Sequence, residues 1–107
     1  MTSSSSQSVR HLILCRFKEG TSEEQISIFI DAFRALKDQI PGVLSFEHGA
    51  NNSPEGLNRG MVHAVLLTME SPAARDAYLP HPAHQRFVAE QTGILAEVQV
   101  LDWSPLA

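Results

Sequence analysis

The sequence has one cysteine, no long apolar run and few basic residues, and each shortage excludes a class of protein. Cys15 has no partner within the chain, so an internal disulfide and a cysteine-based zinc site are excluded, and a small buried hydrophobe is expected. No apolar stretch approaches the roughly 20 residues that cross a bilayer, which argues against a membrane role. Eight basic against twelve acidic residues give a net charge of −4, so nucleic acid is not an expected partner.

The residues that are present predict one globular domain with short tails. With 107 residues, 43% of them hydrophobic, the chain can build one core and is too short for two. Residues 1–8, MTSSSSQS, lack the basic and apolar parts of a signal peptide, so a disordered N-terminal tail and a cytoplasmic location are expected. The domain is expected over residues 9–103, followed by a C-terminal tail over residues 104–107.

The first half of the chain is predicted to form a strand, a helix and a second strand. Alternating apolar residues predict a strand over residues 9–18. Thr21 followed by Glu24 has the spacing of a capping box, and apolar residues then recur every three to four positions. This pattern predicts an amphipathic helix that ends near Ile40, before a second strand over residues 43–49.

The second half is predicted to hold two more strands and two short helices. A strand over residues 61–69 follows a loop rich in Asn, Pro and Gly. Pro72 and Pro82 each favour the first position of a helix, and residues 97–103 close the chain as a strand. The order β-α-β-β-α-β predicts a ferredoxin-like fold of the α+β class, an antiparallel sheet with helices on one face.

The other face of this sheet is predicted to be apolar as well. A naked apolar patch of this size is hard to keep in water, so a second copy of the sheet is expected to cover it. The sequence therefore predicts a homodimer through the sheet face. The residues assigned to this face are Leu12, Leu14, Val62, Ala64, Leu66, Val98 and Val100.

Several strings in these elements resemble the stress-response A/B barrel family, also called Dabb. They come in the order and spacing of the family, and the resemblance covers roughly residues 9–103. It implies a ferredoxin-like subunit whose sheet pairs with that of a partner to form a dimeric α/β barrel. The strings are HLILCRFKEGTSEEQ, ALKDQIPGVLSFEHGANNSPEG, RGMVHAVLLTME, AYLPHPAHQRFV and VQVLDW.

The resemblance also implies a site, because the family includes a polyketide cyclase. It places Tyr78 at the catalytic tyrosine and His84 at the catalytic histidine, and it aligns His11 and His63 with two strand histidines that would contact a substrate. A histidine with a pKa near its ordinary value of about 6.5 suits a general base, and a neutral phenol can donate a hydrogen bond to an enolate. This chemistry needs no cofactor. The expected apolar wall consists of Ile13, Phe29, Ile30, Phe33, Val65, Leu67 and Phe87.

Two functions follow from these residues. The first is a homodimeric Dabb protein whose small pocket, lined by His and Tyr, binds a small carbonyl or aromatic compound. The alternative is a cofactor-free, cyclase-like lyase or isomerase with His84 as general base and Tyr78 as hydrogen-bond donor. Val88 and Gln91 stand where the resemblance implies small glycines, so a long substrate tunnel is not expected.

The histidines also have structural interpretations. His81 precedes Pro82 and is a plausible helix cap, and His48 is expected on the surface. His11 and His63 could serve only to form hydrogen bonds inside a partly wet core. A bound metal is not expected, because an H-x-x-H motif interrupted by proline is a weak signal.

Overall fold

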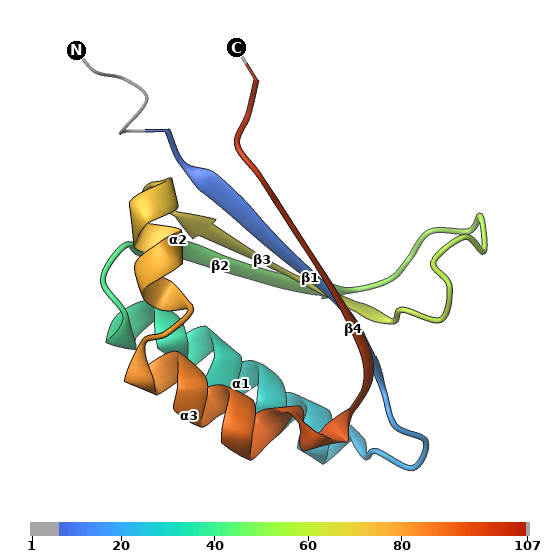
Figure 1. The fold of residues 1–107 in the computed structure, drawn as a ribbon. Helices are drawn as coiled ribbons and strands as arrows, with labels where there is room; N and C mark the ends of the chain where they lie inside the picture. Colours follow the sequence, from blue (N-terminus) through green and yellow to red (C-terminus); the bar gives the residue numbers. More distant parts are fainter. Residues whose placement is uncertain (1–6, 107) are drawn as a thin grey trace.

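A four-stranded antiparallel sheet carries the helices of the described residues on one face (Figure 1). The computed structural model describes residues 7–106, so most of the predicted N-terminal tail lies outside the described residues. The strand order is β2-β3-β1-β4, which confirms the predicted ferredoxin-like α+β fold. The elements are β1 (Val9–Phe17), α1 (Glu23–Gln39), β2 (Val43–Ala50), β3 (His63–Met69), α2 (Pro72–Tyr78), α3 (Pro82–Gln91), a 3-10 turn (Thr92–Ile94) and β4 (Leu95–Trp103).

The helix α1 begins one residue later than the predicted capping box. Ser22 is the N-cap: its hydroxyl accepts from the backbone N–H of Gln25, and the Gln25 side chain accepts from the N–H of Ser22. The prediction that Thr21 and Glu24 form this box is wrong. The Thr21 hydroxyl instead donates to the carbonyl of Lys18 and closes the turn after β1.

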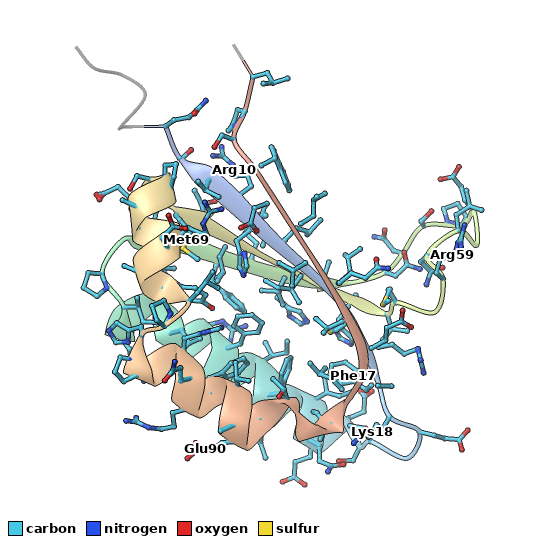
Figure 2. All side chains as sticks on the ribbon, in the orientation of Figure 1. Arg10, Phe17, Lys18, Arg59, Met69 and Glu90 are labelled. Atoms are coloured by element: carbon cyan, nitrogen blue, oxygen red, sulfur yellow. The ribbon has the colours of Figure 1, made fainter. Side chains whose placement is uncertain are left out.

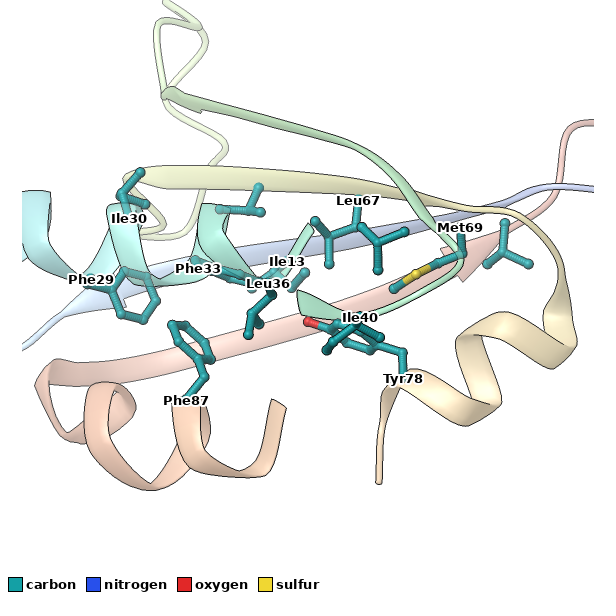
Figure 3. Close-up of a cluster of buried hydrophobic side chains, with 13 residues drawn as sticks. Ile13, Phe29, Ile30, Phe33, Leu36, Ile40, Leu67, Met69, Tyr78 and Phe87 are labelled. Carbon is teal, nitrogen blue, oxygen red and sulfur yellow. The ribbon is translucent and has the colours of Figure 1, made fainter. Parts of the chain in front are cut away.

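The core fills the space between the inner face of the sheet and the helices (Figure 3). Alternate residues of β1 point into it, as the sequence pattern predicts. Cys15 is fully buried, and burial raises the pKa of its thiol to about 11, in keeping with a small hydrophobe. The cluster is formed by Val9, Ile13, Phe29, Ile30, Phe33, Leu36, Ile40, Val43, Val65, Leu67, Met69, Tyr78 and Phe87.

The outer face of the sheet differs from the prediction on β4. Val98 and Val100 pair with Cys15 and Ile13 of β1, and partners in an antiparallel pair share a face. Both valines therefore point to the helix side, and their assignment to the outer face is wrong. Their places on the outer face are taken by neighbours in the alternation: Leu101 lies opposite Leu12 and Trp103 opposite Arg10.

Two short helices follow β3, as predicted, because Pro80 lies between them and Pro82 begins the second. Ser71 caps α2 through a bond from the N–H of Ala74. His81 caps α3: its Nδ1 accepts from the N–H of Ala83 at 3.0 Å, which confirms the predicted cap. The chain turns between Tyr78 and His81, so α3 packs on α1 while α2 packs on the sheet (Figure 1).

The loop from residue 51 to residue 62 extends beyond the body of the domain, and Arg59 lies in its projecting part (Figure 2). No helix among residues 7–106 is both long enough and apolar enough to cross a membrane.

Candidate functional site

A pocket of about 300 Å³ opens between α3 and the β1–β4 edge of the sheet. Its rim is apolar and accessible, because Leu79, Val88, Val98 and Val100 remain 43–57% exposed. Its polar groups come from two histidines, a tyrosine and a threonine. The lining residues are His11, Ile13, Phe29, Phe33, Tyr78, Leu79, His84, Phe87, Val88, Thr92, Leu95, Val98 and Val100.

His84 enters this pocket from the first turn of α3. Its Nδ1–H donates to the carbonyl of Leu79 at 2.9 Å, because a carbonyl oxygen can only accept. The neutral ring therefore carries its lone pair on Nε2. Burial lowers the pKa of His84 below its ordinary value, the bond to Leu79 partly offsets this, and the nearby His11 adds to the lowering. At neutral pH the ring is an uncharged base.

Tyr78, the last residue of α2, is fully buried beside His84, and their ring centroids are 4.4 Å apart. Figure 3 shows the ring extending from α2 into the core layer, with the hydroxyl at its inner end. No polar atom among residues 7–106 lies within hydrogen-bonding distance of this hydroxyl. Burial raises the pKa of Tyr78, so the phenol stays protonated and has a hydrogen to donate.

His11 lies on the other side of Tyr78, with ring centroids 5.7 Å apart in an edge-to-face arrangement. Its Nδ1–H donates to Asp102 Oδ1 at 2.6 Å, and Arg75 donates to the other carboxylate oxygen at 2.9 Å. These bonds join β1, β4 and α2, and they fix the orientation of the His11 ring. The pocket therefore holds two oriented imidazoles and one phenol without a polar partner in residues 7–106.

The residues predicted for the site fall into two groups. His84, Tyr78, His11, Ile13, Phe29, Phe33 and Phe87 line one pocket. The other four do not line it: Ile30, Val65 and Leu67 are buried elsewhere in the core, and His63 lies near the β2–β3 loop. His11, His63, His81 and His84 are not gathered at one point.

Sequence reasoning did not find Thr92, which lines the pocket, or Asp102 and Arg75, which hold His11. Asp102 lies directly opposite His11 in the β1–β4 pairing although the two are far apart in the chain. Once β4 is placed beside β1, this register is enough to predict the contact. The sequence does not predict the contact of Arg75 with Asp102 in the same way, because this contact depends on how α2 packs on the sheet.

A second pair of histidines lies at the other end of the inner face. Nε2 of His48 and Nδ1 of His63 are 2.8 Å apart, and the two rings are parallel within 4°. Phe17 packs against the His63 ring edge to face at 5.2 Å. Burial, His63 and Arg34 lower the pKa of His48. His48 is exposed as predicted, and it also has a histidine partner that the sequence did not reveal.

The comparisons with known proteins agree with this architecture. The stress responsive A/B barrel domain, Dabb, matches residues 9–105. The chain belongs to the Dabb family. It is 36% identical to the stress-response A/B barrel domain-containing protein HS1 of Arabidopsis thaliana, over 91% of this chain and 89% of that protein. It is 28% identical to olivetolic acid cyclase of Cannabis sativa, over 91% of this chain and 96% of the cyclase.

Solved structures of related proteins have the same fold. The crystal structure of At3g17210 from Arabidopsis thaliana superposes with a TM-score of 0.89 at 35% identity, over 92% of this chain and 96% of that one. A ferredoxin-like protein of unknown function from Jannaschia sp. CCS1 superposes with a TM-score of 0.77 at 25% identity, over 90% of this chain and 97% of that one. That protein is described as dimeric, so self-association occurs among the structural neighbours of this Dabb domain.

Proposed function

We propose that this Dabb protein binds a small, uncharged carbonyl or aromatic compound in the pocket between α3 and the sheet. The observation that carries the proposal is the buried hydroxyl of Tyr78: it has no partner among residues 7–106, and it belongs to a residue that lines an open pocket. A buried hydroxyl without a partner costs free energy, so folds retain one where a ligand satisfies it. A carbonyl or phenol oxygen suits this donor.

The character of the pocket supports an uncharged ligand. No lysine, arginine, aspartate or glutamate lines it, so a charged group would lose hydration without gaining a counter-charge. Aromatic rings from α1 and α3 form its floor, and accessible valines form its rim. The volume of about 300 Å³ lies at the small end of ligand sites and fits a compound of one ring or a short branched chain.

A second candidate function is proton transfer, favoured by the bond between His84 and Leu79. This bond leaves Nε2 of His84 as a base, and the His84 ring lies beside the Tyr78 ring. Nε2 would take a proton from the carbon next to a carbonyl. The electron pair of the broken C–H bond would form a carbon–carbon double bond, and the π pair of the carbonyl would move onto its oxygen. Tyr78 would stabilise the resulting enolate by a hydrogen bond. The name of the cyclase relative is consistent with carbonyl chemistry of this kind.

Proton exchange tests both functions, and the product of a reaction does not have to be identified for it. Small ketones, aldehydes and phenols are screened by chemical shift changes in the labelled protein, and binders with an α-hydrogen are then followed in D2O for deuterium incorporation. We expect His84→Ala to abolish exchange and Tyr78→Phe to weaken both binding and exchange, whereas Gln85→Ala, an exposed neighbour on α3, leaves both unchanged. Absence of any binder rejects the ligand site, and binding without exchange rejects only the proton transfer.

The outer face of the sheet supports a homodimer. Leu101 and Trp103 of β4 are 63% and 42% exposed, and they extend the apolar surface of Leu12 and Leu14 on β1. A second copy would cover this surface through the same residues on both chains. The pocket opens on the opposite side of the sheet, so both copies would keep their sites accessible.

A further inference from the structure

The His48–His63 pair is separate from the pocket and unused by either proposed function. It lies at the end of the inner face where β2 and β3 meet the protruding loop. In the register of these strands His63 is opposite Ala50, two residues along β2 from His48. The two side chains are therefore diagonal neighbours on one face, close enough for long side chains to meet.

The two rings meet edge to edge rather than face to face. Their nitrogens approach to 2.8 Å while the centroids stay 5.0 Å apart in parallel planes. One nitrogen must donate and the other accept, so two lone-pair positions converge on one shared proton. A proton held in this way occupies a place that a metal ion can take.

We propose that His48 and His63 form a binding site for a divalent late transition-metal ion, with copper(II) the preferred ion. Neutral imidazole is a strong ligand for these ions, and copper(II) gives the most stable complexes of the divalent first-row series. Two nitrogens bound to one ion at about 2.0–2.1 Å are about 2.8–3.4 Å apart for angles of about 90–110°. The observed 2.8 Å needs only a small opening and a rotation of His48, whose side chain is exposed.

The surroundings define what kind of site this is. Among residues 7–106 no third His, Cys, Asp or Glu joins the pair, so water would complete the coordination shell. Phe17 holds the His63 ring, which keeps one ligand in place. The positive charge of Arg34 lowers the pKa of His48. Arg34 also donates a hydrogen bond to the carboxylate of Asp31 at 2.8 Å, and this negative charge partly offsets the effect. The bound ion would therefore exchange with ions in solution, unlike zinc in a closed structural site.

A titration of the full chain with copper(II) at neutral pH tests the proposal. Calorimetry measures the affinity and stoichiometry, and electron paramagnetic resonance identifies the ligands. We expect one ion per chain and hyperfine splitting from two nitrogens. His48→Ala and His63→Ala should each weaken binding at least about tenfold, because each removes half of the protein ligands. His81→Ala removes the histidine that caps α3, outside the pair, and should leave copper binding unchanged.

Copper binding that survives both His48→Ala and His63→Ala would overturn the proposal. Copper binding that is weakened as much by His81→Ala would overturn it as well. Either result would indicate adventitious binding elsewhere on the chain. Failure to bind copper at micromolar concentrations overturns it as well. Backbone amide spectra of each variant show whether the fold is intact, and Arg34→Gln supplies a variant that keeps both histidines. Loss of this positive charge should strengthen copper binding severalfold, whereas a site elsewhere on the chain would not respond.

Discussion

The contrast between His84 and Tyr78 shows how single residues prepare the pocket. Both lie beside the same apolar surface, yet the histidine nitrogen Nδ1 is satisfied by a backbone carbonyl while the tyrosine hydroxyl has no partner among the described residues. One group is therefore fixed in orientation and the other has a free hydrogen to donate. The site combines a base of known tautomer with a buried donor that has no partner among residues 7–106.

The titration of His84 follows from its burial. We expect its midpoint to lie below about 6.5, measured by the pH dependence of its ring signals in NMR spectra. The folded state disfavours the charged ring, so the unfolded chain binds the proton more readily. His84 therefore lowers the free energy of unfolding as the pH falls through about 6.5, and it contributes no such loss at higher pH. A midpoint at or above 6.5 would contradict the proposed role as a neutral base.

Replacing Tyr78 with phenylalanine separates stability from binding. The change removes a buried hydroxyl that has no partner among residues 7–106, so we expect the free energy of unfolding in urea to stay equal or rise by about 1 kcal/mol. Ligand binding should weaken at the same time. The control Tyr78→Leu leaves a cavity in the core and should cost about 3 kcal/mol. A large loss of stability in Tyr78→Phe would mean that the hydroxyl has a structural partner.

At the scale of elements, the turn between α1 and β2 determines how closely α2 can pack. Gly42 has a φ of +92°, and a Cβ built there would lie 2.7 Å from the Cβ of Ala74 on α2. Its carbonyl also accepts from the backbone N–H of Glu70, at the end of β3. The glycine is needed both for its backbone conformation and for the close approach of α2, the helix that carries Tyr78.

Substitution of Gly42 by alanine should therefore destabilise the whole domain. A left-handed conformation costs a non-glycine residue about 1–2 kcal/mol, and the contact with Ala74 adds to it, so we expect a loss of about 2 kcal/mol or more in urea unfolding. Gly93→Ala is the matched control, because nothing lies within 4 Å of a Cβ at that position. Equal effects from both substitutions would show that the packing of α2 is not the cause.

At the scale of the whole molecule, the two faces of the sheet have different roles. Helices cover the inner face and leave the pocket at its β4 edge, while the outer face carries apolar residues with no cover among residues 7–106. A surface of this kind is typical of an interface. The proposed dimer and the proposed ligand site can therefore coexist, because they use opposite sides of one sheet.

A charge on the outer face should disrupt the dimer without unfolding the subunit. We expect Leu101→Asp to raise the dissociation constant at least about tenfold, since the interface would bury two unpaired carboxylates. Size-exclusion chromatography with light scattering measures this change. Ile28→Asp is the control, an equally drastic change at a residue of α1 that is 53% exposed. A wild-type monomer at micromolar concentration would reject the interface.

Much of the fold could be predicted because its signals are local. Alternation along β1, the prolines that begin α2 and α3, and the cap at His81 each depend on residues a few positions apart. The same local evidence misplaced the capping box by one residue, since Thr21 and Ser22 are both good caps and only the packed helix selects Ser22. It also misplaced Val98 and Val100, because β4 has apolar residues on both faces.

The sequence by itself determined the element order, the family and the pairing of Tyr78 with His84 as neighbours around a proline turn. Only the tertiary structure decided which partners the histidines have: Asp102 and Arg75 for His11, and His48 for His63. These contacts join strands and helices that are distant in the chain. Their geometry depends on strand register and helix packing, which are set by the free energy of the whole core rather than by any local pattern.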